Sequence, residues 1–363
     1  MASIVQRALK RVVQRRPEGT LLFVGDGAGW ILDEVAQQLE EHLSPAFGCR
    51  AVSDNWMKAR GCTIHLIDRA WASIDGVLDR VDPSNRLIGV WWHGRLDSPD
   101  PVIQAALRRL KAHHSRFTRV QVTCSSGRGT LEALGVPSEK IVTLPVGVDL
   151  KIFRPPLEDA SRSAARRVLG VGDGIAAVGC FQKDGNGWNE GTEPKLIKGP
   201  DILVDALVLL NARHPIHVVI PGPARGYVKR RLKDAGVPFS APGIVPRKEL
   251  PRLYHALDLY VSPSRDEGGP VGVLEAMASG VPVASSATGI PADLIKPGVN
   301  GLLADVGDAE ALASACAKLI ESVTLRSTLA QGALASIQPY DWKTLVERYS
   351  SELYAPIHPA SDG

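Results

Sequence analysis

Short β-rich runs alternate with helical stretches through most of this chain, and that order restricts the fold more than any other feature. In the first half the β-rich runs are residues 20–25, 62–67, 86–92, 118–124 and 141–145. After the proline-containing segment 151–158 the pattern restarts, with runs at 174–181, 216–221, 257–262 and 281–285. Strands that alternate with helices predict parallel βαβ units. We therefore expect two doubly wound α/β domains, over residues 1–152 and 153–339.

Length and composition agree with this division. The 363 residues suit two cores of about 150 residues each. No apolar run reaches the roughly 18–20 residues that a membrane span needs, and a net charge of +3 is too small to indicate nucleic-acid binding. The five cysteines are scattered without C-x-x-C spacing, which predicts free thiols in a reducing compartment. Since the N-terminus also lacks a secretory pattern, we expect a cytoplasmic protein.

Two amphipathic segments and one long loop stand outside the strand pattern. Residues 3–16 place arginines and lysines around an apolar helical stripe, which favours either packing on their own domain or contact with an anionic membrane. Residues 341–354 predict a further helix, preceded by the helix breaker Pro339. The stretch 182–198 is rich in glycine and charge, and loops of that length are usually functional or disordered. Its Trp188 either stacks on a base or sugar or anchors the loop.

The segment 264–285 (SRDEGGPVGVLEAMASGVPVAS) carries the most chemical information. A glycine-rich turn follows a strand there, and a helix begins near Pro270. Free backbone amides at the positive end of a helix suit a diphosphate. Glu267 precedes this helix and Glu275 lies within it, so one carboxylate can meet the front of a ligand while the other lies deeper. The alternative is that Glu267 caps the helix and Glu275 is solvated.

This segment resembles the E-x7-E signature of the retaining family 4 glycosyltransferases (glycosyl transferases group 1), which have the GT-B fold. The resemblance extends to residues 137–155, 198–207, 289–307 and the helix after Asp341. It implies two Rossmann-like domains facing a central cleft, with a C-terminal helix (340–356) that crosses back to the N-terminal domain. It further implies that the first domain binds the acceptor and that the second binds a nucleotide-diphosphate sugar through a loop at 289–307.

The resemblance also assigns roles to single residues. Glu275 would bind the ribose hydroxyls, Glu267 would contact the transferred sugar, and Lys198 would neutralise the diphosphate. Cys180 stands near the position of a family arginine, so Lys183 or Lys195 would supply that charge. The expected donor-binding residues are Glu275, Lys198, Lys183, Gly27, Gly29, Gly268, Gly269, Val271, Gly272 and Gly222.

Two features of the first domain complete the expected site. The loop 25–29 (GDGAG) follows a strand and opens a helix, so its amides either approach the donor or simply form a tight turn. His93 lies at a predicted strand end, where the family has an active-site histidine and where open α/β sheets bind ligands. The alternative for His93 is a core or surface position. Arg95 and Arg128 either meet an anionic acceptor or are solvated.

The expected reaction is a retaining transfer with same-face attack, in which the leaving phosphate oxygen takes the acceptor's proton. Lys198 and helix amides would compensate the developing charge, so no metal is expected to be required, and the sequence has no Asp-x-Asp pair or histidine cluster to hold one. Two alternatives stay open. One is a nucleotide-sugar epimerase or a glycosyl phosphorylase on the same fold. The other is a donor-binding protein without turnover, which the missing arginine near Cys180 favours.

Overall fold

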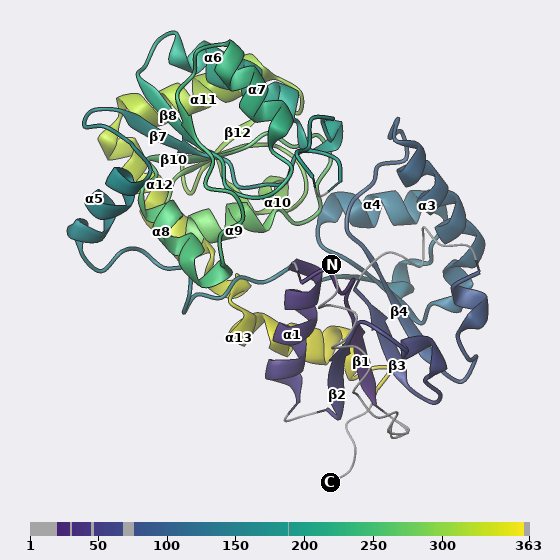
Figure 1. The fold of residues 1–363 in the computed structure, drawn as a ribbon. Helices are drawn as coiled ribbons and strands as arrows, with labels where there is room; N and C mark the ends of the chain where they lie inside the picture. The colour runs from purple at the N-terminus through teal and green to yellow at the C-terminus, as the bar shows by residue number, and fades with distance from the viewer. Residues whose placement is uncertain (1–19, 30, 45–46, 68–75, 188, 359–363) are drawn as a thin grey trace, which may run out of the picture.

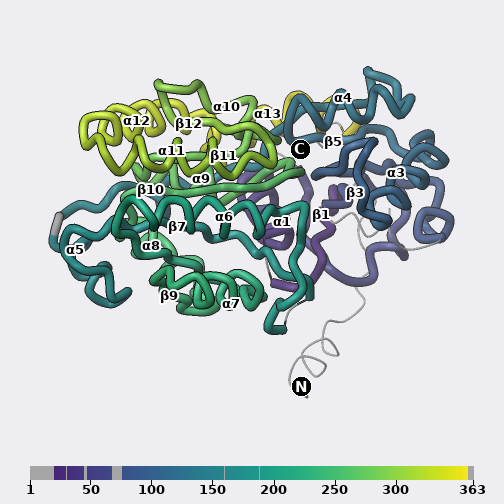
Figure 2. Tube along the Cα trace, turned by 90° about the horizontal axis from the view of Figure 1, so that it is seen from above, coloured from purple at the N-terminus to yellow at the C-terminus, as the bar shows by residue number. Residues whose placement is uncertain are grey.

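The computed structural model describes residues 20–29, 31–44, 47–67, 76–187 and 189–358, which form two α/β lobes (Figure 1). Each lobe contains one six-stranded sheet, and the two sheets are separate. The basic segment 3–16 and Trp188 lie outside the described residues. Seen from above, the teal-to-green lobe and the purple-to-blue lobe lie side by side (Figure 2).

The N-terminal sheet is parallel throughout and has the strand order β2-β1-β3-β4-β5-β6. The order reverses beside β1, so the sheet is doubly wound, as predicted. Its strands are β1 Leu21–Val24, β2 Cys49–Val52, β3 Thr63–Leu66, β4 Arg86–Trp91, β5 Arg119–Val122 and β6 Ile141–Thr143. The helices of this lobe include α1 Ile31–Leu43, α3 Pro101–His113 and α4 Ser125–Leu134.

The C-terminal sheet repeats this plan with the order β12-β11-β10-β7-β8-β9, again all parallel. Its strands are β7 Ala176–Gly179, β8 Ile216–Val219, β9 Phe239–Ser240, β10 Leu259–Ser262, β11 Val283–Ser286 and β12 Leu302–Ala304. Its helices include α5 Asp159–Val168, α6 Pro200–Asn211, α7 Gly226–Asp234, α8 Leu250–His255, α9 Val271–Ala278, α10 Ile290–Leu294, α11 Ala309–Glu321 and α12 Val323–Ser336.

All nine β-rich runs contain a strand, and three strands escaped the sequence pattern. β2 lies at a sheet edge and is not fully buried, so it carries no continuous apolar run. β9 has only two residues, and β12 lies inside 289–307, which resembles a loop of the family. Strands at sheet edges need few apolar side chains because only part of their surface is covered.

Central strands show why the apolar runs predict this fold. In β1, Leu21 and Phe23 pack into the cluster that includes α1, while Leu22 and Val24 pack into the cluster on the opposite face. All four residues are buried. A parallel strand covered on both faces therefore needs a continuous apolar run, which is the signal that residues 20–25 carry.

The C-terminal helix returns to the first lobe, as the family resemblance implied. α13 Trp342–Arg348 continues into the π-helix η9 Tyr349–Tyr354, and Figure 1 shows α13 beside α1. Trp342 covers Gly147, where a Cβ atom would collide with the indole ring. The Tyr354 hydroxyl lies 2.8 Å from Nδ1 of the buried His65, whose pKa burial lowers to about 3. This docking ties the C-terminal residues to β3 of the N-terminal sheet.

Candidate active site

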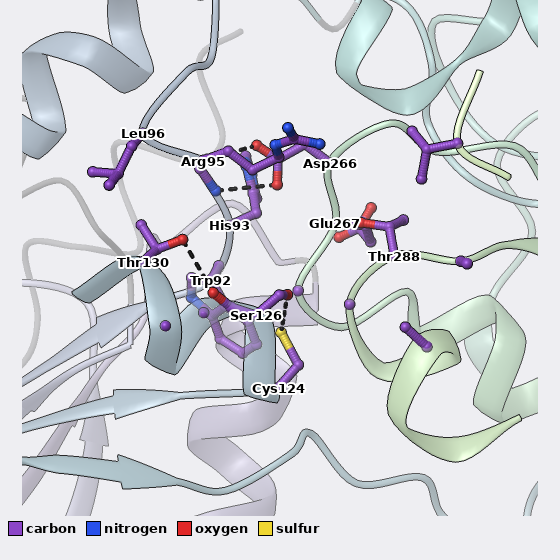
Figure 3. A pocket seen from close by; sticks show the side chains of 18 of the residues that line it. Trp92, His93, Arg95, Leu96, Cys124, Ser126, Thr130, Asp266, Glu267 and Thr288 are labelled. Atoms are coloured by element: carbon purple, nitrogen blue, oxygen red, sulfur yellow. Dashed lines mark hydrogen bonds between the residues drawn. The ribbon is translucent and has the colours of Figure 1, made fainter. Parts of the chain in front are cut away.

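A cavity of about 410 Å³ lies between the two lobes. Its walls come from residues 92–97 after β4, 124–130 at the start of α4, 266–268 after β10 and 287–292 after β11. All four segments follow the carboxyl ends of parallel strands, which is where open α/β sheets bind ligands. Figure 3 shows His93 and Arg95 on one side of this cavity and Glu267 and Thr288 on the other. The geometry therefore places the motif glutamate opposite the predicted histidine.

Two glycines allow the lobes to approach each other beside this cavity. A Cβ atom at Gly268 would collide with the carbonyl oxygen of Trp92, and one at Gly269 would lie 2.9 Å from Cγ1 of Val146. Sequence reasoning interpreted both glycines as part of a diphosphate turn. The structure supplies a packing reason for them, and their role in donor binding stays a prediction.

Two aspartates of the C-terminal lobe bind backbone amides of the N-terminal lobe at the cavity edge. The carboxylate of Asp266 accepts hydrogen bonds from the amides of Gly94 (3.2 Å) and Arg95 (3.1 Å), drawn in Figure 3. Burial raises the pKa of Asp266, and the two amides oppose that rise. Asp293 accepts from the amide (2.8 Å) and from the hydroxyl of Ser125, at the start of α4. Sequence reasoning missed both contacts, because each partner comes from a distant part of the chain.

Glu267 forms an ion pair with Lys198 inside the site. The ammonium donates to Oε2 of Glu267, whose residue is only 8% exposed although it borders the cavity. Lys198 ends the 3-10 turn η6 Leu196–Lys198, and Gly199 follows it with a left-handed φ of 64°. Glu267 does not cap α9, because Pro270 occupies the N-cap position and no side chain among the described residues caps that helix end. The structure thus joins two residues that sequence reasoning had predicted as catalytic.

Glu267 lines the cavity, whereas Glu275 does not. Glu275 is 5% exposed, so the alternative of a solvated Glu275 is wrong. Its Oε1 accepts from Nη1 of Arg247 at 2.6 Å, and its Oε2 accepts from the Tyr254 hydroxyl at 2.7 Å. An ionised carboxylate offers about four acceptor positions. About two acceptor positions of Glu275 therefore remain beyond these two hydrogen bonds.

The contact between Arg247 and Glu275 could not be predicted from the sequence. Arg247 lies in the 3-10 turn η7 Arg247–Glu249, and it forms a second ion pair with Glu34 of α1. In the sequence it stands in the polar stretch PRKE, where nothing distinguishes it from a solvated cation.

The predicted backbone donors differ in their surroundings. The amides of Gly27 and Gly29 donate to the carboxylate of Asp33, at 2.9 and 2.6 Å, so this loop forms a closed turn in the structure. The amide of Gly222 donates to the carbonyl oxygen of Gly243 at 2.7 Å. Donor binding by any of these three amides would require an exchange of these bonds, and it stays a prediction.

The first amides of α9 differ from those of Gly27, Gly29 and Gly222, because no hydrogen bond within the helix occupies them. Val271 begins this helix, as predicted, and the first amides of a helix have no carbonyl one turn earlier to bind. Gly272 is glycine for a packing reason, because a Cβ atom there would collide with the hydroxyl of Tyr260. Val271 and Gly272 lie at the N-terminal end of the helix, which carries the positive end of its dipole. Their role in binding a diphosphate stays a prediction.

A buried arginine lies next to Cys180, where the family resemblance implied a missing cation. Arg225, at the N-cap of α7, forms an ion pair with Asp184 at 3.2 Å and donates to the carbonyl oxygen of Gln182. Burial raises the pKa of the Cys180 thiol to about 11, and the neighbouring Arg225 opposes that rise. Sequence reasoning named Lys183 and Lys195 for this charge. Burial lowers the pKa of Lys183. That Lys183 or Lys195 supplies the missing positive charge stays a prediction.

Comparisons with known proteins agree with this geometry. Residues 194–335 match the family model "Glycosyl transferases group 1". The family resemblance is confirmed. The chain is 28% identical over 275 residues to D-inositol 3-phosphate glycosyltransferase of Thermobispora bispora, covering 71% of this chain and 60% of that relative. It is 31% identical over 210 residues to the lipopolysaccharide core biosynthesis mannosyltransferase LpsB of Rhizobium meliloti, covering 55% of each. The chain thus spans only 55 to 60% of the length of these relatives.

Solved structures share the fold over most of the chain. HepE of Anabaena in complex with UDP-glucose superposes with a TM-score of 0.73 at 20% identity, covering 92% of this chain and 99% of that one. Sucrose-phosphate synthase of Thermosynechococcus elongatus gives a TM-score of 0.71 at 18% identity, covering 91% and 97%. The predicted GT-B fold is confirmed. Within the described ranges, no group of three or more His, Cys, Asp or Glu side chains is placed to hold a metal ion.

Proposed function

We propose that this chain transfers a sugar from a nucleotide-diphosphate sugar to an acceptor hydroxyl with retention of configuration. The observation that carries the proposal is the ion pair between Lys198 and Glu267 at a cavity between two GT-B lobes. The region that matches the glycosyl transferases group 1 includes both residues and Glu275. The structural neighbour HepE is described with UDP and with UDP-glucose, which supports a nucleotide-sugar donor for the C-terminal lobe.

In the proposed reaction the bond between the sugar carbon and the diphosphate oxygen breaks. The acceptor oxygen bonds to the same face of that carbon, and the leaving phosphate oxygen takes the acceptor's proton. Lys198 and the first amides of α9 would stabilise the negative charge on the leaving diphosphate. Before a donor arrives, Glu267 neutralises the Lys198 ammonium. When the diphosphate takes that partner, the Glu267 carboxylate is released toward the positive charge that develops on the sugar.

The remaining site residues have positions that fit this scheme. Glu275 is held by Arg247 and Tyr254 with acceptor positions left for ribose hydroxyls. His93 borders the cavity from the N-terminal lobe, where we place the acceptor, which would be a glycan, a lipid-linked sugar or a small molecule. Because a lysine and helix amides face the diphosphate in this scheme, we propose that no metal is required. Activity that is lost with EDTA and restored by Mg²⁺ or Mn²⁺ would contradict that point.

The test is release of nucleoside diphosphate from UDP-, GDP- and ADP-sugars, with and without candidate acceptors, followed by NMR of the product anomer. We expect one donor class to be used, with acceptor-dependent release and retained configuration. An inverted product would overturn the retaining mechanism. A protein that binds no donor and releases no diphosphate from any of the three classes would overturn the proposal itself.

One observation favours a second candidate, a donor-binding protein without turnover. By the family resemblance, Cys180 stands near the position of an expected arginine, and the neighbouring Arg225 is already paired with the buried Asp184. In this case nucleotide sugar would raise the melting temperature, but no diphosphate would be released with any acceptor. Ligand at 100 times its Kd stabilises a protein by about 2.7 kcal/mol, so binding is measurable without turnover. An epimerase would instead alter the sugar without an acceptor.

We further propose a cytoplasmic location with peripheral membrane contact through the basic segment 3–16. None of the helices in the described ranges is long and apolar enough to cross a bilayer. Flotation with anionic phosphatidylserine vesicles would compare the full chain with a variant that begins at Gly19. Equal and negligible binding by both proteins would remove the membrane contact.

A further inference from the structure

Three charged side chains link the donor-side helix to the other lobe. Arg247 donates to Oε1 of Glu275 in α9 at 2.6 Å, and its Nε forms an ion pair with Glu34 in α1. Glu34 belongs to the N-terminal lobe, whereas Arg247 and Glu275 belong to the C-terminal lobe. We call Glu34, Arg247 and Glu275 the interdomain triad. One planar guanidinium thus contacts both lobes at once.

Arg247 also contacts the segment that connects the lobes. Its guanidinium carbon lies 4.8 Å from the centre of the Phe153 ring, in the connection 151–158. Phe153 is fully buried and packs edge-to-face against Tyr254, the second hydrogen-bond donor to Glu275. A shift of one lobe relative to the other must therefore change the contacts of Arg247 on at least one side. Packed contacts of this kind have few alternative arrangements, so they transmit displacement.

The charges within the triad make Arg247 difficult to replace. With both glutamates ionised, one guanidinium faces two carboxylates, and only a planar group with several N–H donors can bind both at once. The Glu275 and Arg247 side chains are 6% and 26% exposed. The structure describes two hydrogen-bond donors to Glu275, Arg247 and Tyr254. Removal of the guanidinium would leave the Tyr254 hydroxyl alone. The orientation of Glu275 toward a ligand would then no longer be determined.

We propose that Arg247 is a positioning residue, which orients Glu275 for the donor and couples donor binding to the arrangement of the two lobes. This inference rests on the proposed function, because it concerns the carboxylate assigned to the nucleotide. It adds that Glu34, which belongs to the lobe assigned to the acceptor, acts on donor affinity through Arg247. A change in the contact between Glu34 and Arg247 should then alter both the donor affinity and the arrangement of the two lobes.

The first experiment separates orientation from general stability. Binding of UDP, GDP and ADP is measured by titration calorimetry, and the nucleotide that binds best is used throughout. Arg247→Gln should raise its Kd by about 10- to 150-fold, which corresponds to one charged hydrogen bond. Arg247→Lys keeps the charge and should restore a substantial part of the loss. In turnover with the matching nucleotide sugar, both variants should raise KM far more than they lower kcat.

The second experiment tests the coupling and needs no nucleotide. Glu34→Ala removes the contact in the N-terminal lobe without touching the donor residues, and Glu41→Ala changes an exposed glutamate of the same helix as a control. Small-angle scattering of the ligand-free protein should show expansion for Glu34→Ala and none for Glu41→Ala. Nucleotide Kd should rise about 3- to 10-fold for Glu34→Ala alone. In the Arg247→Gln background, Glu34→Ala should have no further effect.

The two experiments fail in distinguishable ways. If no nucleotide binds the wild-type protein, the proposed function is wrong, and scattering still measures whether Glu34 and Arg247 tie the lobes together. If nucleotide binds but Arg247→Gln and Arg247→Lys leave its Kd unchanged, Arg247 does not position Glu275. If Glu34→Ala changes neither scattering nor Kd, the coupling between the lobes is refuted. Should Arg247→Gln not fold, Arg247→Lys should still raise Kd measurably, because an ammonium cannot bind both carboxylates as a guanidinium does, and an unchanged Kd would refute the positioning role. Glu34→Ala still decides the coupling.

Discussion

The two glutamates of one motif stand in very different surroundings. Glu267 borders the cavity and has a lysine as its partner, a flexible point charge that can exchange partners. Glu275 does not line the cavity, and it is held by a planar guanidinium and by a tyrosine hydroxyl. The same side chain therefore serves two kinds of interaction. An exchangeable partner suits a group that acts while charge develops, and a fixed orientation suits a group that binds a part of the substrate that does not react.

The largest effect is expected at the exchangeable partner. Glu267→Gln keeps the shape of the side chain and removes its charge, so kcat should fall by about two or more orders of magnitude. Donor affinity should not fall, because the Lys198 ammonium no longer has to exchange a charged Glu267 for the diphosphate. Glu310→Gln, at an exposed position, is the matched control. An unchanged kcat, in a protein that melts like wild type, would show that the charge at Glu267 has no catalytic role.

A smaller effect of a different kind is expected at the fixed carboxylate. If Glu275 holds the ribose, its contacts exist in both the ground state and the transition state, and their loss mainly raises KM. Glu275→Ala should weaken donor binding by roughly 10- to 150-fold, at 1.5–3 kcal/mol for each charged hydrogen bond. The measurement is donor KM and kcat on protein with a normal melting temperature. A fall in kcat at unchanged KM would reverse the comparison between the two glutamates.

A still smaller effect should follow when only one of the two donors to Glu275 is removed. Tyr254 is fully buried, and Tyr254→Phe deletes the hydroxyl at nearly constant volume. Arg247 still orients the carboxylate, so donor KM should rise by only about 3- to 10-fold, on the order of 1 kcal/mol. Tyr260→Phe removes a neighbouring buried hydroxyl that donates nothing to Glu275 in the structure, and it serves as the control. Equal changes of KM in both variants would indicate a general packing effect.

The smallest expected effect concerns pH and Glu34. Burial raises the pKa of Glu34 to about 7; Arg247 lowers it, and Glu275 and Asp149 raise it. A raised carboxyl pKa means that the buried charge opposes folding, so stability falls as pH rises from the ordinary pKa of 4.5 to about 7 and levels off above that. Glu34→Gln cannot ionise and should gain on the order of 1 kcal/mol relative to wild type between pH 6 and pH 8. That gain corresponds to roughly 2–4 °C in melting temperature.

Melting curves of both proteins at the two pH values check this prediction. Glu41→Gln, on the same helix but exposed, should follow wild type. A melting-temperature difference between Glu34→Gln and wild type that is the same at pH 6 and pH 8 would contradict a titration of Glu34 near neutrality.

The local sequence was sufficient for the parts of the site that follow from strand ends and helix starts. The end of β10 and the start of α9 at Val271 could both be predicted from residues 264–285. The position of His93 after β4 followed in the same way. These predictions depend on signals within a few residues of each position: the apolar pattern of a strand and the proline at the start of a helix.

Contacts between distant segments could not be predicted in this way. The polar residues around Arg247 in the sequence predict a surface cation. Only the folded chain brings Glu34 of α1 within reach of it. Gly268 was interpreted as part of a phosphate turn, whereas the carbonyl group that requires a glycine there belongs to Trp92 of the other lobe. The partners of Asp266 and Asp293 lie in the other lobe for the same reason.

The sequence by itself therefore determined two parallel α/β domains, a helix over residues 341–354 and a motif that resembles the family signature; the return of that helix to the first lobe was implied by the family resemblance. Each depends on apolar periodicity or on residues at short spacing, and these act through local backbone geometry and burial. Only the tertiary structure decided which cation each glutamate meets and how the lobes are held together. Glu34 lies 213 residues from its partner Arg247 in the chain, and no local pattern records a contact that exists only when both lobes have folded and docked.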